Sequence, residues 1–274
     1  MHTKDLLFRM SNLEFFVLGS GSSGNCSLLQ VNGNWVMIDC GFSMKQTKER
    51  MRTHSVQLEQ IQDVVLTHLD RDHFNPVWCR SFLLRGIRVH MHESHVPRAI
   101  RAGLDASCIC AFKNHLEIHG TDVEAVHFSH DVLGTIGFIF DTGSTRFGFA
   151  TDLGRVPQNL LDCFVNLDGI AFESNYDPRM QEMSNRPESL KSRIMDGEGH
   201  LSNEQALAAI CHIASKSDLQ QIVLLHLSRQ CNSPQIIRDL YQDNLAHLYN
   251  SVTITCQDRC SRLLSITNNV KSTV

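Results

Sequence analysis

Short apolar runs bounded by turn residues recur along most of the chain, and polar stretches that open with proline or capping residues lie between them. Such runs are typical of buried strands, and such stretches are typical of helices. We expect strands at 13–18, 26–31, 34–39, 64–66, 87–91, 124–131, 137–140, 146–150, 169–172, 221–225, 251–256 and 262–266. We expect helices near 45–52, 75–85 and 187–195, after Ser202 or Asn203, and from near Pro234. This mixture favours an α/β protein.

One stretch, from Thr67 to Phe74, concentrates residue types that bind metals. It follows the apolar run 64–66, so it lies where a buried strand ends and the chain turns outward. Histidine nitrogens and carboxylate oxygens are ligands that Zn, Mn or Fe accept, and ligands this close on one turn can converge on a point. A polar surface turn is the alternative, but so many ligand types directly after a strand favour a metal site. They are His68, Asp70, Asp72 and His73.

Polar residues also stand where later apolar runs end. His130, Asp152 and His226 are each placed at or just after such an end. Loops at strand ends are where binding and catalytic residues concentrate, so we expect His130 rather than the neighbouring His127 to face a site.

The loop from Gly19 to Cys26 is rich in Gly and Ser, which permits close backbone approach beside a site. Glycine-rich loops are more often ordinary turns, and no Gly-Lys-Ser/Thr sequence makes this one a P-loop. Ser22, Ser23 and Asn25 are candidate contacts for a terminal phosphate of a substrate.

Three other groups are weaker signals. A basic helix near Lys45 is either a solvated face or a rim that meets phosphates. Cys108 and Cys110 are better explained as small buried hydrophobic residues than as metal ligands. Histidines on and after the strand that starts at Ile87 are more typical of surface or supporting positions than of a separate metal site. These are His90, His92 and His95.

Composition sets the broad class. With 274 residues and 42% hydrophobic content, we expect one globular enzyme domain over 1–274, with its core at about 13–267. Residues 1–10 do not resemble a signal peptide, and no apolar run is long enough to cross a bilayer. Ten cysteines without framework spacing indicate reduced thiols and a cytoplasmic protein. A net charge of −4 argues against nonspecific wrapping of nucleic acid but leaves room for a local basic face.

The stretch 67–74 resembles the His-x-His-x-Asp-His signature of the metallo-β-lactamase superfamily, with Asp70 where the second His is usual. Further motifs resemble the YycJ/WalJ-like branch, which is related to tRNase Z and β-CASP-type phosphodiesterases. Each motif is weak alone, but together and in this order they are highly specific. They are Gly19–Cys26, Phe128–Asp131, Ala150–Gly154, Glu173–Asn175, Gly199–Asn203 and His226–Ser228.

This resemblance implies a four-layer αββα sandwich. It also implies a bacterial, metal-dependent phosphodiesterase that acts as a 5′ to 3′ exonuclease on DNA and does not bind a membrane. It implies two divalent metal ions, which we expect to be Zn, Mn or Fe. Metal one would take His68, Asp70 and His130; metal two would take Asp72, His73 and His226; and Asp152 would bridge both. Asp70 places an anionic oxygen where a neutral nitrogen is usual, which favours harder ions such as Mn or Fe. Tyr176 stands where the branch tends to have His, so one contact near the site is expected to differ.

In the mechanism that follows, a hydroxide bridging the two ions, oriented by Asp72 and Asp152, attacks phosphorus in line. His200 would donate a proton to the leaving oxygen, and Glu173 would orient His200 or His226. A structural role for His200 before a helix is the alternative.

The same residues leave other functions open. The first is hydrolysis of a small ester, thioester, lactone or cyclic phosphodiester. The second is di-iron redox chemistry, suggested by the acid at position 70, although that would require a flavin domain or partner. The third is noncatalytic binding, which the full ligand set disfavours. The sequence does not indicate the oligomeric state.

Overall fold

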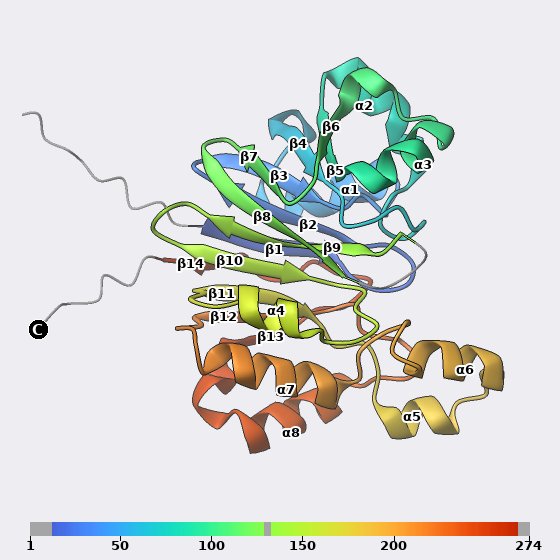
Figure 1. Ribbon diagram of the computed structural model, residues 1–274, viewed down its shortest axis with the longest axis vertical. Helices are drawn as coiled ribbons and strands as arrows, with labels where there is room; N and C mark the ends of the chain where they lie inside the picture. Colours follow the sequence, from blue (N-terminus) through green and yellow to red (C-terminus); the bar gives the residue numbers. More distant parts are fainter. Residues whose placement is uncertain (1–12, 129–132, 268–274) are drawn as a thin grey trace, which may run out of the picture.

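Two mixed sheets packed face to face form the centre of the molecule (Figure 1). The computed structural model describes residues 13–128 and 133–267. The first sheet contains β1 (Leu13–Gly19), β2 (Cys26–Val31), β3 (Asn34–Ile38), β4 (Ile61–Val65), β5 (Arg88–His92), β6 (Ile109–Phe112) and β14 (Leu264–Ile266). The strand order is β14-β1-β2-β3-β4-β5-β6, so β14 pairs with β1 although the two are far apart in sequence.

The second sheet repeats this plan. It contains β7 (His115–Ile118), β8 (Thr121–Phe128), β9 (Thr135–Asp141), β10 (Arg146–Ala150), β11 (Gly169–Glu173), β12 (Gln221–Leu225) and β13 (Val252–Ile254). The strand order is β13-β12-β11-β10-β9-β8-β7. The neighbouring strands from β14 to β3 in the first sheet and from β7 to β10 in the second pair antiparallel, whereas the neighbouring strands from β3 to β6 and from β10 to β13 pair parallel.

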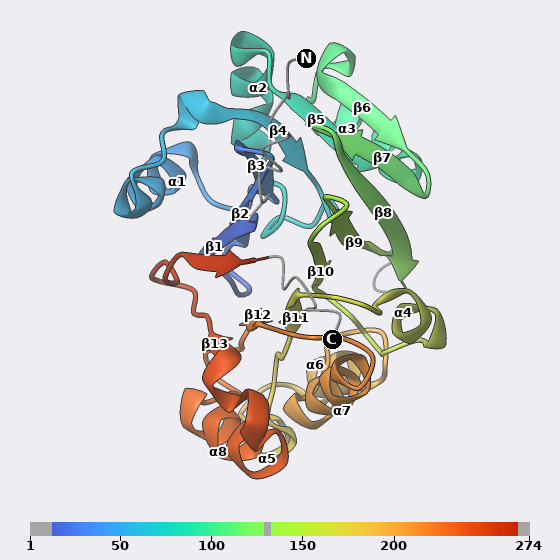
Figure 2. The ribbon, with the colours of Figure 1, turned by 90° about the vertical axis from the view of Figure 1, so that its left-hand side faces the viewer.

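Helices cover the outer face of each sheet, as Figures 1 and 2 show. The helices on the first sheet are α1 (Met44–Met51), α2 (Cys79–Arg85) and α3 (Val96–Arg101). Those on the second are α4 (Gln158–Cys163), α7 (Asn203–Ala214) and α8 (Pro234–Asn244). Two further helices, α5 (Pro178–Met183) and α6 (Glu188–Met195), lie to one side of α7 and α8. The predicted αββα sandwich is confirmed.

The alternation of side chains along β1 shows why the sheets pack in this way. Phe15 and Val17 point into the core between the two sheets, where Phe15 lies against Phe147 with ring centroids 4.8 Å apart. Phe16 and Leu18 point to the opposite face and pack under the helices. Because both of its faces are covered, β1 is apolar along almost its whole length.

The structure refines several predicted elements. The helix expected over 75–85 begins as a 3-10 turn at Pro76–Trp78 and continues as α2. Ser202, rather than Asn203, caps α7, because its side chain accepts a hydrogen bond from the backbone N–H of Gln205. Strands β6 and β7 and helices α4 and α5 were not expected from the sequence. No helix among the described residues is long and apolar enough to span a bilayer.

Candidate metal centre

Polar residues follow the parallel strands at the carboxyl-terminal edge of both sheets. Asp39 follows β3, His68 lies beyond β4, Asp152 beyond β10, and His226 follows β12. Parallel strands bring these ends to one edge, where sites in open α/β sheets are found. Asp39, Asp152 and His226 have φ values of 60°, 53° and 56°. A left-handed backbone conformation costs about 1–3 kcal/mol of stability at each such residue. Residues in this conformation cluster at functional sites, where the backbone must direct a side chain into the site.

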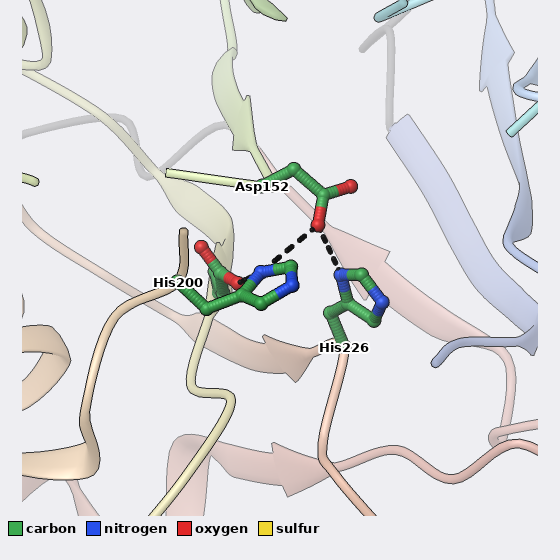
Figure 3. Close-up of side chains that lie close together, drawn as sticks. Asp152, His200 and His226 are labelled. Atoms are coloured by element: carbon green, nitrogen blue, oxygen red, sulfur yellow. Dashed lines mark hydrogen bonds and ion pairs between the residues drawn. The ribbon is translucent and has the colours of Figure 1, made fainter. Parts of the chain in front are cut away.

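Asp152 is the centre of the cluster. Its Oδ2 atom lies 2.5 Å from Nε2 of His73 and 3.7 Å from Nε2 of His68. Its Oδ1 atom contacts Nδ1 of His226 and lies 3.3 Å from Nδ1 of His200. Figure 3 shows the rings of His200 and His226 converging on this one carboxylate. Residues from strand ends in both sheets therefore meet at Asp152.

Three overlapping groups of metal-type ligands occur among the residues that the structure describes, each with its ligand atoms within 4.8 Å of one another. They are Asp152, Glu173, His200 and His226; His68, His73 and Asp152; and Asp72, His73 and His226. Both carboxylate oxygens of Asp152 and both ring nitrogens of His226 are buried without a well-formed hydrogen bond. Buried polar atoms almost always have a partner, and mixed carboxylate and imidazole donors suit a divalent cation. The residues present therefore fit a metal.

Asp39 fixes the orientation of His73. Its Oδ2 atom lies 2.7 Å from Nδ1 of His73, and its Oδ1 atom accepts a hydrogen bond from the backbone N–H of Thr67 at 2.9 Å. This arrangement places the proton of the ring on Nδ1 and turns Nε2 toward Asp152. A carboxylate behind a ligating histidine is the usual way in which proteins fix its tautomer. Asp39 was not identified from the sequence, where its signal was only an aspartate directly after an apolar run.

The glycine- and serine-rich loop holds parts of the cluster together. The Ser20 hydroxyl accepts a hydrogen bond from the backbone N–H of His226 and donates one to Oδ1 of Asn25, both at 2.8 Å. The backbone N–H of Asn25 donates to the carbonyl of Asp72 at 2.6 Å. The loop thus connects the turn after β12 to the turn after β4. Its small residues let its backbone come close enough to both turns to form these hydrogen bonds.

Glu173, which is buried, forms a pair beside Asp152 with His200, whose side chain is 21% exposed. Oε1 of Glu173 lies 2.7 Å from Nδ1 of His200, and its Oε2 accepts a hydrogen bond from the backbone N–H of Leu153 at 2.5 Å. Burial would lower the pKa of His200, but Glu173 and Asp152 raise it to about 10. Glu173 therefore holds both His200 and the loop that carries Asp152.

The other buried acids and histidines also shift one another's pKa values. Burial would raise the pKa of Asp152, but the charges of His226 and His73 outweigh it and hold that pKa well below its usual value. Burial would lower the pKa of His226, yet Asp152 raises it to about 9. Asp152 and Asp39 likewise raise the pKa of His73 against the effect of burial. In the absence of a cation these shifts favour the protonated form of His73 and His226, and a cation that binds there would have to displace those protons.

Two predicted ligands lie outside these groups. Asp70 borders the same pocket, but its Oδ1 accepts a hydrogen bond from Nη2 of Arg98 on α3 at 2.9 Å. His130 lies outside the described residues, so the set His68, Asp70 and His130 stays a prediction. Tyr176 is buried against Ile194 and does not line the pocket.

The predicted substrate contacts occupy different places. Ser22 lines the pocket, whereas the backbone N–H of Ser23 donates to Gln257 at 2.8 Å. Asn25 is buried beneath the pocket, where Nδ2 lies 2.8 Å from Nε2 of His73. Ser22 is thus the one of these three side chains that lies in the pocket lining, and their contacts with a substrate stay predictions.

The weaker sequence signals have structural explanations. Arg50 of the basic helix α1 donates to the carbonyls of Leu18 and Gln257, both at 3.0 Å, which makes it a packing residue. His90 lies 2.6 Å from the buried carboxylate of Asp63. All ten cysteines are free, as expected, and His90, His92 and His95 belong to none of the ligand groups found among the described residues.

A pocket of about 890 Å³ opens over the cluster. Its floor includes His68, Asp72 and Asp152, and one wall is formed by the stretch that runs from the end of α5 to His200. Pockets of this size bind drug-sized ligands.

Comparisons with known proteins agree with this geometry. Residues 34–227 match the family described as the beta-lactamase superfamily domain. Exodeoxyribonuclease YycJ of Bacillus anthracis is 26% identical over 234 residues, which cover 82% of this chain and 86% of that protein. Exodeoxyribonuclease WalJ of Streptococcus pneumoniae serotype 2 is 25% identical over 241 residues, covering 85% and 88%. The crystal structure of the metallo-beta-lactamase fold protein YhfI from Bacillus subtilis shares the fold, with a TM-score of 0.68 at 13% identity over 93% of this chain and 99% of that one.

The family match spans more than half of the chain, and the two helix-covered sheets are those of the same fold. The fold implies divalent metal binding, for which the groups around Asp152 supply candidate ligands. This chain therefore belongs to the β-lactamase superfamily and is a hydrolase of the metallo-β-lactamase fold.

Proposed function

We propose that this hydrolase is a phosphodiesterase that removes nucleotides from the 5′ end of DNA and uses two divalent metal ions. The observation that carries the proposal is the convergence of three ligand groups on one pocket floor, in a chain whose relatives bear the name exodeoxyribonuclease. A pocket of about 890 Å³ has room for a whole nucleotide as well as for the phosphodiester group that is cleaved.

The two ions would share Asp152. His68 would hold one, with Asp70 and His130 as further ligands, and Asp72, His73 and His226 would hold the other. When bound, a pair of Zn, Mn or Fe ions would neutralise charge on the phosphodiester and lower the pKa of a water.

The side chains around this pair would perform the remaining steps. Asp72 borders the pocket with 24% of its side chain exposed, so its carboxylate can orient an attacking water. His200 also lines the pocket, and its pKa of about 10 keeps it protonated at neutral pH. It would donate that proton to the leaving oxygen while Glu173, at 2.7 Å, holds the ring in place. In this scheme His200 is the general acid and Glu173 is a positioning residue.

Digestion of a 5′-phosphorylated DNA strand labelled at its 3′ end, with added Mn and protein of measured metal content, tests the proposal. We expect progressive shortening of the labelled strand in wild-type protein. Asp72→Ala should lose this activity while keeping its far-ultraviolet circular dichroism. If the metals are bound and the DNA stays intact, the DNA assignment is wrong, and small phosphodiesters and esters become the next substrates to test.

A further inference from the structure

The segment that contains α5 and α6 forms one wall of the pocket, although it lies outside the four layers of the sandwich (Figure 1). This segment contributes Arg186, Leu190, Arg193, Ile194 and Glu198 to the lining. Two of these side chains are permanently cationic, and neither is among the groups that would hold a metal.

Arg186 is fixed in the wall by uncharged partners. Its guanidinium donates to Oε1 of Gln181 at 3.1 Å, to Oγ of Ser228 at 3.3 Å and to Oε1 of Gln230 at 3.3 Å. No carboxylate among the described residues forms an ion pair with it. Arg186 is therefore held in position with its positive charge uncompensated.

The side chain of Arg193 is exposed and forms no hydrogen bond or ion pair with any described residue, while its backbone belongs to helix α6. The next residue, Ile194, is buried against Tyr176 and Cys231. A Cβ atom added to Gly199 would lie 2.4 Å from the carbonyl oxygen of Arg193, which shows how closely α6 packs beside the segment leading to His200. A long cationic side chain thus projects from a helix whose backbone packs against the segment that leads to the proposed general acid.

Two guanidinium groups without a carboxylate partner among the described residues give this pocket wall a positive charge that an anionic ligand can bind. Glu198, the acid in this wall, forms no ion pair with either arginine among the described residues. A nucleic-acid strand carries a negative charge at every phosphate, and affinity for it comes largely from such cations. Arginine also presents a planar fork that matches phosphate oxygens in pairs.

We propose that Arg186 and Arg193 form a phosphate clamp that binds phosphates flanking the scissile one, so that the site selects a polyanionic strand over an isolated phosphodiester. The clamp rests on the proposed function for its substrate, but it also predicts binding in the absence of cleavage. Arg193 offers the cleaner test, because truncation of Arg186 also removes the contact with Ser228.

The experiment compares Arg193→Ala, Arg193→Lys and a matched control, Arg179→Ala, whose arginine lies exposed on α5 outside the pocket lining. Binding of a fluorescent, 5′-phosphorylated single-stranded oligonucleotide is measured by anisotropy over a range of salt concentrations. Hydrolysis of the oligonucleotide and of bis(p-nitrophenyl) phosphate is measured in parallel with added Mn.

For Arg193→Ala we expect about a tenfold weaker binding of the oligonucleotide and a salt slope smaller by roughly 0.7, the contribution of one phosphate contact on a single strand. KM for the oligonucleotide should rise far more than KM for the small diester. Arg193→Lys should recover part of the loss, because the charge returns without the fork. Arg179→Ala should behave as wild type.

The outcomes separate the clamp from the proposed function. If wild type digests DNA and Arg193→Ala matches Arg179→Ala in affinity, KM and salt slope, the clamp is refuted while the exonuclease stands. If wild type leaves DNA intact but binds it in a manner that depends on Arg193, the clamp stands and the exonuclease falls. If binding is independent of Arg193 and no DNA is cut, both are refuted.

Discussion

Replacing Asp39 by asparagine tests whether the metal centre depends on a residue that would not itself touch a metal. The carboxylate of Asp39 accepts hydrogen bonds from the backbone N–H of Thr67 at 2.9 Å and from its hydroxyl, and lies 2.7 Å from Nδ1 of His73. Asparagine keeps the size of the side chain but has one acceptor oxygen, so a buried donor loses its partner. A buried donor left unsatisfied costs about 1–3 kcal/mol of stability.

The effect on metal binding follows from the same geometry. Without the carboxylate, the ring of His73 is less basic and less firmly oriented at Nε2. Changes at such supporting residues typically weaken metal binding about 10- to 100-fold, or about 1.4–2.7 kcal/mol. Chelator competition with metal-free protein measures the affinity, and urea unfolding measures the stability.

Asp141→Asn is the matched control. It breaks a 2.7 Å ion pair with Arg146 at the opposite end of β10, so it makes the same chemical change away from the cluster. If Asp39→Asn and Asp141→Asn bind Zn or Mn with the same affinity, the positioning argument is wrong.

Three further predictions follow from single contacts. A Cβ atom at Gly41 would lie 1.8 Å from the carbonyl oxygen of Asp72, so Gly41→Ala should lose about 1–3 kcal/mol of stability in urea unfolding and weaken metal binding; unchanged values would contradict the packing. Burial opposes charge on Asp63, but its hydrogen bond with His90 helps to lower its pKa below 3.8. The ionised carboxylate of Asp63 should thus stabilise the fold above pH 3.8 and lose this effect as the pH falls below it. In urea unfolding, Asp63→Asn should be about 1–3 kcal/mol less stable than wild type at pH 7, and this difference in stability should become smaller in acid. The pKa of His226 is raised from 6.5 to about 9, so its charge should stabilise the metal-free protein fully below pH 6.5 and lose this effect as the pH rises through 9. Chelator competition should accordingly show metal affinity increasing over that range, and a flat profile would refute the assignment.

The sequence predicted those parts of the molecule that depend on local pattern. Apolar runs located most strands of both sheets, and a ligand-type residue directly after a run, as with Asp152 and His226, lies at the cluster. A strand end can be recognised from neighbouring residues alone, and parallel strands then gather their ends at one edge.

Contacts between distant segments could not be read in this way. Asp39 supports His73 only because β3 pairs in parallel with β4, and nothing near Asp39 in the sequence indicates that pairing. Arg50 looked like a solvated or phosphate-binding charge, yet its guanidinium lies 4.1 Å from the ring centre of Phe42. Asp70 has the residue type of a ligand, but its bond with Arg98 depends on where α3 packs.

The pairing of β1 with β14 has a consequence for how the protein is made. Leu13 pairs with Ile266, so the ribosome synthesises one edge of the first sheet long before its neighbour exists. Ile266 also packs against Gly169 of the second sheet, so contacts between the two sheets are completed only when this residue has been synthesised. Until then the nascent chain carries an unpaired β-strand edge, which is prone to aggregate. We therefore expect ribosomes that stall before Leu264 to release chains that depend on chaperones.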